Sequence, residues 1–301
     1  MEPSGVLIIN KEEGMTSHDV VNKIRRLYGT RRVGHTGTLD PLATGVLTVL
    51  VGRAAKTAEY LVADSKEYIA TLRLGITTDT EDITGEVLTR CDSIPSPDQV
   101  TSAVKSFEGD IEQIPPMYSA LKVDGQKLCD LARKGVSVER KPRHVTIFSI
   151  EVSPTDTPTD YILRVSCSSG TYIRTLCADI GAKLGCGGAM ASLCRSRAGD
   201  FSLGNAHTLE ELEEMSEEER VSLLCPTEKL FLSLPKIELP EFFEKLSRSG
   251  CEVYQKKIRT SFAVGERVRL CSADGKFYAL GEVREYEKGL AIKSIKMFDI
   301  E

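Results

Sequence analysis

One loop of this chain combines a carboxylate, an imidazole and two arginines with residues that exclude regular structure. Residues 31–45 read RRVGHTGTLDPLATG. The three glycines permit backbone angles closed to other residues, and Pro41 biases Asp40 towards an extended conformation. A carboxylate held in one pose can act as a nucleophile. We therefore expect an active-site loop, although an isolated Asp-Pro pair is more often a solvated turn.

Residues 34–45 resemble the catalytic signature of the TruB-type tRNA pseudouridine synthases. The resemblance extends, in family order, to four further segments: 14–17, 66–70, 110–122 and 170–175. It therefore spans most of residues 5–200. One departure is Glu12, because family members commonly carry proline directly after the lysine that corresponds to Lys11. The turn here lacks that ring constraint.

The chemistry of such an enzyme suits a single carboxylate. Making pseudouridine breaks a uridine N-glycosidic bond and joins C5 of the uracil to the same sugar carbon, so positive charge develops on the sugar. The resemblance implies that Asp40 is the nucleophile, that Arg174 is its charged partner and that Tyr68 lies against the target base, where its hydroxyl can shuttle protons. From the residues alone, Arg174 could equally be an exposed helix arginine and Tyr68 a half-buried strand residue.

Four further residues are implied only by the resemblance. His35 would stack where the uridine leaves its RNA stack, since a base cannot turn about its sugar while paired and stacked. Tyr172 and Leu193 would line the base pocket, and Lys11 would support the loop. Without the family, Leu193 is more simply a core residue and His35 a turn residue.

The reaction requires no metal, nucleotide or redox cofactor, and the sequence carries no phosphate-binding or dinucleotide motif. Its nine cysteines are scattered without a Cys-x-x-Cys pair, which favours reduced thiols in a cytoplasmic protein. A zinc site is conceivable, but the spacing of the candidate ligands does not suit a zinc knuckle: Cys167, Cys177, Cys186 and Cys194. No apolar run approaches the roughly 20 residues that cross a bilayer.

The charge distribution favours a polyanionic partner in spite of the net charge of −5. Residues 210–220 carry a local charge of −6, which leaves +1 on the rest of the chain. Basic residues gather instead in 23–32 and 122–143, on either side of the Asp40 loop in sequence. A solvated face usually explains a single charge run, but two patches beside a catalytic-looking loop favour RNA.

Residues 109–142 combine glycines, prolines and abundant basic residues without a long apolar period. We interpret them as a basic arm that clamps RNA, with Lys127, Arg133 and Lys134 as contacts. The alternative is a surface excursion with one amphipathic helix at 126–133.

The apolar pattern predicts an α+β fold. Ser17 should cap a first helix, whereas Ser96 and Thr208 open capping boxes. Other helices are expected at 57–63 and 172–184. Strands are expected at 5–10, 46–51, 67–74, 143–152 and 160–167, followed by a strand pair up to 201.

From about Leu234 the pattern changes to short strands. This part resembles the PUA domain, an RNA-binding module. We divide the chain into a catalytic domain, 1–233, and a PUA-like domain, 234–301. The resemblance implies a pseudouridine synthase fold, with a central mixed, largely antiparallel sheet flanked by helices.

Together these features predict an isomerase that converts the tRNA T-loop uridine conventionally numbered 55 to pseudouridine, with the target base flipped into the pocket. We expect a cytoplasmic monomer that recognises the tRNA T-arm without cofactor, membrane or protein partner. Two alternatives remain open: a non-catalytic RNA-binding or tRNA-folding protein, and a synthase for another RNA. The presence of Asp40, Tyr68 and Arg174 favours the enzyme.

Overall fold

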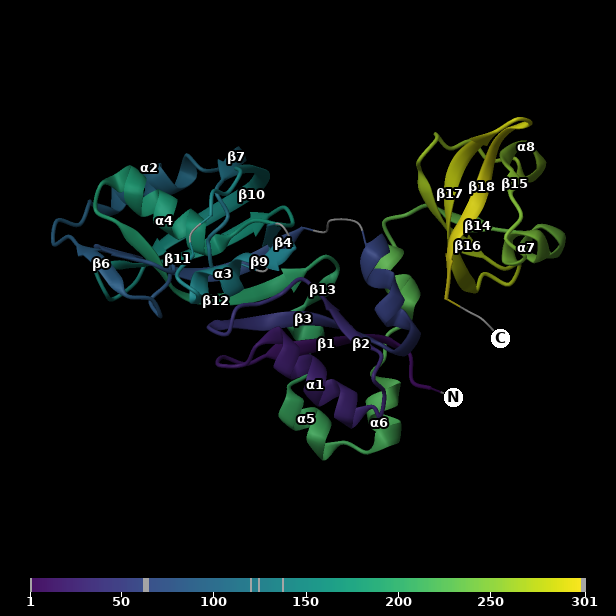
Figure 1. The fold of residues 1–301 in the computed structure, drawn as a ribbon, viewed down its shortest axis with the longest axis horizontal. Coiled ribbons are helices and arrows are strands. Elements are labelled where there is room, and N and C mark those ends of the chain that lie inside the picture. The colour runs from purple at the N-terminus through teal and green to yellow at the C-terminus, as the bar shows by residue number, and fades with distance from the viewer. Residues whose placement is uncertain (1, 62–64, 120, 124, 137, 299–301) are drawn as a thin grey trace. The chain divides into compact units, whose positions relative to one another are not determined.

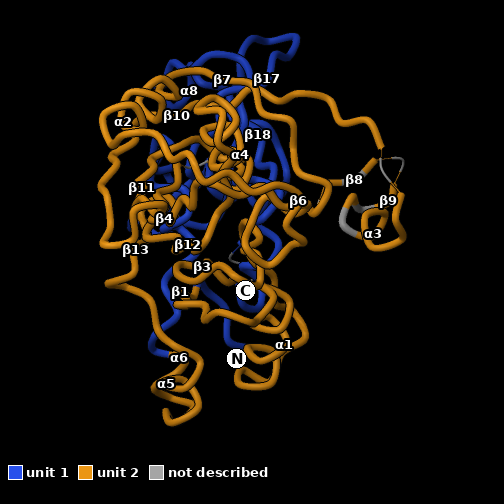
Figure 2. The backbone as a smooth tube through the Cα atoms, turned by 90° about the vertical axis from the view of Figure 1, so that its left-hand side faces the viewer, with its two compact units in different colours: residues 1–6, 50–62, 222–301 blue, residues 7–49, 63–221 orange. Residues whose placement is uncertain are grey.

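A computed structural model describes residues 2–61, 65–119, 121–123, 125–136 and 138–298, without the side chains of Lys122, Lys127 and Cys129. These residues form two compact units, one from 1–6, 50–62 and 222–301 and the other from 7–49 and 63–221 (Figure 2). No helix among the described residues is long and apolar enough to cross a membrane.

The larger sheet has nine strands and is mixed, as predicted (Figure 1). The main path runs β1 (Gly5–Lys11), β3 (Ala43–Val51), β12 (Gly188–Ala198), β4 (Lys66–Leu74), β11 (Asp160–Cys167), β10 (Arg143–Pro154) and β7 (Gly109–Gln113). Two short strands extend it: β2 (Val33–Thr36) on β3 and β13 (Phe201–Ser202) on β12. β12 is parallel to β3 and antiparallel to β4, and the pairs from β4 to β7 are antiparallel.

Helices pack on this sheet. α4 (Ile173–Leu184) lies on β12 and β4, and α2 (Pro97–Lys105) packs against α4 and β10. The predicted capping box at Ser96 is confirmed, with Pro97 as the first helical residue. α4 ends at Gly185, whose φ of 74° supplies the left-handed turn that closes the helix.

The first helix, α1 (Ser17–Leu27), corrects one prediction. Ser17 is the first helical residue, and the cap is Thr16, whose side chain accepts from the Asp19 backbone N–H while the Asp19 carboxylate accepts from Thr16. The box needs an acid three residues after the cap, and only Thr16 satisfies that spacing. The hydroxyl of Ser17 is therefore available for another partner.

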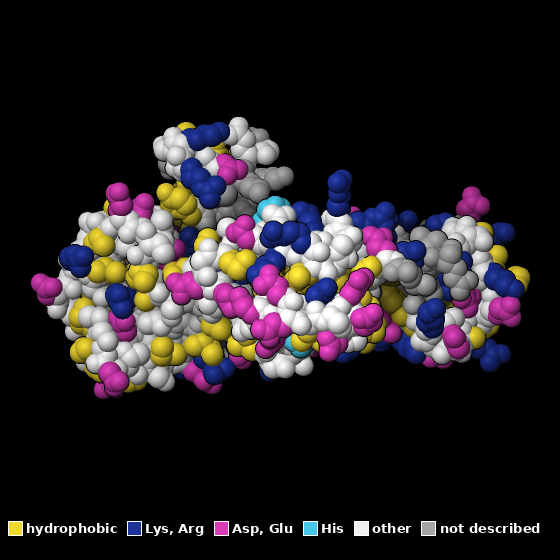
Figure 3. Space-filling view, turned by 90° about the horizontal axis from the view of Figure 1, so that it is seen from below, with side chains coloured by type: hydrophobic (Ala, Val, Ile, Leu, Met, Phe, Trp, Pro, Cys, Tyr) yellow, Lys and Arg dark blue, Asp and Glu magenta, His cyan; other side chains and the backbone are white. Residues whose placement is uncertain are grey.

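Acidic helices follow the sheet: α5 (Leu209–Glu214), capped by Thr208 as predicted, and α6 (Glu217–Ser222). Figure 3 views the molecule from the side on which these helices lie in Figure 1, and acidic side chains gather near the middle of that face. Lys23 of the first basic cluster pairs with Glu213 at 3.0 Å.

The segment 109–142 is not one continuous arm. Its first five residues form β7, an edge strand paired with β10. Beyond β7 lie a small hairpin, β8 (Lys122–Val123) and β9 (Gln126–Lys127), and α3 (Leu128–Arg133). β7 is mostly exposed, so it lacks the alternation by which strands are recognised.

Two shorter elements also differ from the pattern or were not expected. The helix predicted at 57–63 is a 3₁₀ helix, η1 (Gly52–Tyr60), which begins five residues earlier. A second hairpin, β5 (Ile76–Thr78) and β6 (Val87–Arg90), follows β4 and encloses the turn 79–86. The remaining 3₁₀ helices are η2 (Leu203–Asn205) and η3 (Thr227–Phe231).

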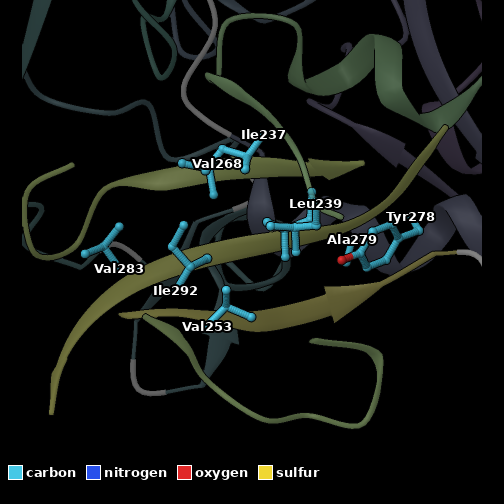
Figure 4. Packing of buried hydrophobic residues seen from close by; sticks show 9 residues of the cluster. Ile237, Leu239, Val253, Val268, Tyr278, Ala279, Val283 and Ile292 are labelled. Carbon is cyan, nitrogen blue, oxygen red and sulfur yellow. The ribbon is translucent and has the colours of Figure 1, made fainter. Parts of the chain in front are cut away.

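The C-terminal part forms the separate β-rich sheet that the sequence predicts. Its strand order is β14 (Lys236–Glu238), β16 (Arg267–Cys271), β17 (Phe277–Tyr286), β18 (Gly289–Met297) and β15 (Val253–Tyr254), accompanied by α7 (Glu241–Arg248) and α8 (Gln255–Ile258). Nine buried side chains form its core, among them Val268, Tyr278 and Ile292 (Figure 4). The hydroxyl of Tyr278 is satisfied by Ser247 at 3.1 Å.

Candidate active site

A pocket of about 340 Å³ opens where the loop after β2 meets β4, β12 and the start of α4. This volume is at the lower end of the range typical of small-molecule sites. Five residues singled out from the sequence line it: Asp40, Tyr68, Tyr172, Arg174 and Leu193. Segments far apart in the sequence therefore converge as expected for a site.

Asp40 and Arg174 form an ion pair at the pocket, with 3.0 Å between Oδ2 and Nε. The Arg174 side chain is 5% exposed and that of Asp40 36%. Burial raises the pKa of the Asp40 carboxyl above its ordinary value, and the charge of Asp82 adds to the rise, while Arg174 and Lys11 oppose it. The carboxylate is thus only partly hydrated and depends on Arg174 for its charge.

Arg174 is itself fixed from several directions. Its Nη1 donates to the Thr80 carbonyl at 3.2 Å and its Nη2 to the Tyr118 carbonyl at 2.8 Å. A second carboxylate, Asp82, lies 3.8 Å from Nη1. The guanidinium is therefore held between two acids and two carbonyls.

Asp82 lies in the turn of the β5–β6 hairpin and is 5% exposed. Its Oδ1 accepts from the Thr80 hydroxyl at 2.8 Å, and from the Thr84 backbone N–H at 2.9 Å and hydroxyl at 2.5 Å. Neighbouring Glu81 has a φ of 64°, rare for a residue with a side chain, and accepts from the Thr175 hydroxyl at 2.6 Å. Through the bond between Glu81 and Thr175, this turn holds the start of α4 in place.

The loop that carries Asp40 is tied to α1. Ser17 Oγ accepts from the Leu39 N–H at 2.9 Å and donates to the Leu39 carbonyl at 3.1 Å. Both groups are buried, so the loop cannot shift here without leaving two backbone groups unpaired. The conformation next to Asp40 is thus fixed by one hydroxyl.

Lys11 lies beneath the loop rather than in the pocket, and it is fully buried. Its Nζ donates to the carbonyls of Glu12 and Met15 at 2.7 Å and reaches that of Pro41 at 3.4 Å. Burial lowers the pKa of Lys11 to about 8, although the charge of Asp40 opposes the shift. This placement agrees with a supporting role.

Tyr68 and Tyr172 provide the aromatic surface of the pocket. Tyr68 is 7% exposed on β4, and burial raises the pKa of its hydroxyl, a shift that the charge of Arg195 opposes. The buried side-chain amide of Gln113 makes two hydrogen bonds with the backbone of Tyr172. It donates to the Tyr172 carbonyl at 3.1 Å and accepts from the Tyr172 N–H at 2.9 Å. β7 thereby fixes the first turn of α4.

The other predicted residues lie outside the pocket lining. His35 lies half-buried in β2, and its buried Nδ1 has no hydrogen-bond partner among the described residues. Burial lowers its pKa, and the charges of Arg195 and His18 add to the decrease. Arg133 and Lys134 are exposed, while the side chain of Lys127 lies outside the described part of the chain.

Two residues were not anticipated, one in the pocket lining and one behind it. Arg195 lines the pocket and is 1% exposed. It lies two positions after Leu193 on β12, so the alternation of a strand would have placed it inward. Asp82 had a weaker signal: threonines two residues before and after it, a pattern that favours side-chain to backbone bonding in a turn. No group of three or more described His, Cys, Asp or Glu residues could hold a metal ion.

Comparison with known proteins identifies the family of this chain. Residues 25–173 match the family model for the N-terminal domain of the TruB family pseudouridylate synthases, and residues 174–231 match that for the tRNA pseudouridylate synthase B C-terminal domain. A tRNA pseudouridine synthase B of Clostridium kluyveri is 41% identical over 98% of this chain and 99% of its own length. One of Bacillus pumilus is 42% identical over 92% of each chain.

Among solved structures, a Cbf5–Nop10–Gar1 complex includes a chain that superposes with a TM-score of 0.75 and 27% identity, covering 98% of this chain and 85% of that one. An H/ACA ribonucleoprotein bound to a substrate RNA gives 0.74 and 25%, with the same coverage. Fold and sequence thus define a pseudouridine synthase, an isomerase. The chain belongs to the TruB family of pseudouridylate synthases.

Proposed function

We propose that this enzyme isomerises the T-loop uridine conventionally numbered 55 in tRNA, with Asp40 as its nucleophile. The observation that carries the proposal is the Asp40–Arg174 pair at 3.0 Å on the wall of a small pocket. The relatives that match over nearly the whole chain are named tRNA pseudouridine synthase B, which supports tRNA as the substrate. The family match supports the choice of reaction.

In this mechanism the target base leaves its stack and enters the pocket. Arg174 keeps Asp40 ionised in a partly dry site, so that the carboxylate can attack or stabilise the sugar carbon as the glycosidic bond breaks. Tyr68 lies on one wall of the pocket, and Tyr172 and Leu193 supply further contacts to the base. Because the same uracil rejoins the sugar, water has no part and a single carboxylate suffices.

RNA contacts outside the pocket are assigned to two regions. The 109–142 segment would clamp RNA through Lys127, Arg133 and Lys134, of which the latter two are exposed. The PUA-like residues 234–301 would contact RNA at a distance from the catalytic domain, 1–233. His35 would take the place of the departing base. We further propose a cytoplasmic monomer that needs no cofactor.

The decisive experiment maps pseudouridine in transcribed tRNA incubated with the pure protein, and in parallel with Asp40→Asn. We expect modification at the T-loop uridine alone, and tRNA binding without product for the variant, because its shape survives but its charge does not. Product formation by the variant within about tenfold of the wild type would remove Asp40 from the nucleophile role. Modification only after addition of a second RNA would favour guide-dependent action.

A further inference from the structure

Arg195 is the largest fully buried side chain in the described part of the chain, and none of the roles above uses its charge. Its Nε donates to the Val46 carbonyl at 2.7 Å and its Nη2 to the Gly37 carbonyl at 3.1 Å. No carboxylate among the described residues lies within ion-pairing distance of it. Two further basic groups, Lys11 and His35, are close enough that Arg195 lowers the pKa of each.

A buried cation without a counter-ion is costly, because carbonyl dipoles replace only part of its hydration. A leucine or methionine at this position would fill similar space without that cost. The backbone of Arg195 is closely packed as well: a Cβ on Gly45, its partner on β3, would lie 2.3 Å from the Arg195 carbonyl oxygen. A charge retained under such conditions needs an anion that appears only during the reaction.

The geometry identifies where that anion would form. Arg195 on β12 is the direct cross-strand partner of Tyr68 on β4, and both line the pocket. Because direct cross-strand partners project from the same face of the sheet, the charge of Arg195 opposes the rise in the pKa of the Tyr68 hydroxyl. Cys167 from β11 and Asp40 from the loop act in the opposite sense and raise the pKa of this hydroxyl. Two other cations line the pocket, Lys66 and Arg174, but Arg174 is already paired with Asp40.

We propose that Arg195 is a positioning residue that stabilises the phenolate of Tyr68 during turnover. This inference rests on the proposed function, in which Tyr68 lies against the uracil. At 1% exposure, and held by two backbone carbonyls, Arg195 cannot reach out to an RNA phosphate. It therefore acts through Tyr68 rather than on the substrate.

The proton balance of the isomerisation gives the phenolate its role. Uridine and pseudouridine differ in that one hydrogen leaves C5 and one appears on N1. The neutral Tyr68 hydroxyl donates its proton to N1 as the glycosidic bond breaks, and the electrons of that bond stay on the uracil. After C5 has bonded to the sugar, the phenolate takes the C5 proton and the C–H electrons restore the ring. Tyr68 ends as it began.

Between these two steps the phenolic oxygen carries a full negative charge in a buried site. Burial favours the neutral hydroxyl in the resting enzyme and makes the phenolate costly. Arg195 provides the compensating charge at that moment without requiring any group to move. The same pairing explains why this cation has no carboxylate partner at rest.

The test uses the full-length enzyme with difluorotyrosine, a more acidic phenol, placed at position 68. Single-turnover rates on saturating tRNA are measured for the wild type, Arg195→Met and Arg195→Lys, each with tyrosine and with difluorotyrosine. We expect Arg195→Met to be slowed about 100-fold, and the more acidic phenol to recover at least about tenfold of that loss. Arg197→Met, an exposed arginine on the same strand, is the matched control and should need no rescue.

Fluorine resonances of the same proteins, without RNA, report the ionisation of residue 68 directly. The midpoint of the phenol titration should move to higher pH in Arg195→Met and stay near the wild-type value in Arg195→Lys. If Arg195→Met does not fold, Arg195→Gln replaces it in the same comparison. Equal midpoints in all variants, together with no rescue, would overturn the proposal. Full activity of Tyr68→Phe would instead refute the role proposed for Tyr68. The titration midpoints of the phenol would still show whether Arg195 favours its ionised form.

Discussion

At the scale of single residues, the site works through the unequal hydration of a few charges. Arg174 is almost completely buried, whereas Asp40 retains some contact with solvent. A substrate atom can therefore approach the Asp40 carboxylate, whereas the buried Arg174 guanidinium is held in place. In the proposed mechanism the reaction uses the charge of Asp40, whereas burial makes the same charge unfavourable for folding.

The unfavourable burial of the Asp40 charge predicts how the stability of Asp40→Asn compares with that of the wild type as pH changes. Because the folded-state pKa of Asp40 is raised, the folded state binds the proton more tightly, and stability is lost as pH rises through the folded pKa. At pH 7 the neutral amide should therefore give a higher melting temperature than the wild type. The gain should vanish below about pH 4, where the wild-type carboxyl is also protonated. A variant less stable than the wild type at pH 7 would show that the pairing with Arg174 outweighs burial.

Asp82 should influence the acidic limb of the pH–rate profile. Its charge contributes to the raised pKa of Asp40, so Asp82→Asn should move this limb to lower pH, whatever the loss in rate. Rates at several pH values below neutrality provide the measurement. Asp79→Asn is the control, since Asp79 accepts from the Glu86 N–H in the same hairpin. A shift to higher pH would mean that Asp82 acts mainly by orienting Arg174.

The sequence predicts those site residues whose own segment carries a motif, and it misses partners that only the fold brings together. Asp40, Tyr68 and Arg174 were found through recognisable motifs. Asp82 lies 92 residues before Arg174, and only the fold brings the two together. Arg195 was missed because an arginine in a strand usually points to solvent, whereas here the fold buries it with backbone carbonyls from β3 and the Asp40 loop as its partners.

At the scale of elements, the loop that carries Asp40 depends on one hydroxyl from α1. Ser17→Ala would leave the buried Leu39 N–H and carbonyl without their partner, at a cost of about 1–3 kcal/mol. We expect a lower melting temperature and a clear loss of single-turnover rate. Ser96→Ala, which removes the cap of α2, should lower stability but spare the rate. Equal effects on rate would show that the loop holds its shape without Ser17.

The hairpin and helix within 109–142 should contribute to RNA binding through charge. Replacing Lys127, Arg133 and Lys134 by alanine should weaken tRNA binding and flatten the plot of log affinity against log salt, because fewer counterions are released. The ion pair between Arg133 and Asp130 is long, at 3.5 Å, and the Arg133 side chain is 73% exposed. Lys105→Ala with Lys183→Ala is a control on α2 and α4. An unchanged slope would place the phosphate contacts elsewhere.

The elements themselves were predictable to different extents. Strands with a buried face, such as β4, and helices with a complete capping box, such as α2, occur where the pattern indicates. β7 escaped because it is an exposed edge strand, held by pairing with β10 rather than by its own side chains. The cap of α1 was misplaced by one residue because two adjacent hydroxyl residues compete for it.

At the scale of the whole molecule, all pocket residues lie within 7–49 and 63–221. Deleting residues 234–301 should therefore leave isomerisation possible but raise the RNA concentration needed for it. Full-length tRNA should suffer more than a T-arm stem-loop, provided that this part contacts RNA beyond the T-arm. Circular dichroism must confirm folding, because η1 loses partners such as Arg267 and Lys296. Equal losses on both RNAs would assign the deleted part to the catalytic unit.

The bond from Arg174 to the Tyr118 carbonyl would link RNA binding to the ionisation of Asp40. The same guanidinium contacts Asp40 on one side and Tyr118, within the segment 109–142 proposed to clamp RNA, on the other. If RNA bound to that segment shifts Tyr118, the proton affinity of Asp40 must change. By thermodynamic reciprocity, the state of that proton then changes the affinity for RNA by the same factor. The affinity for RNA and the ionisation of Asp40 would thus be linked through one equilibrium.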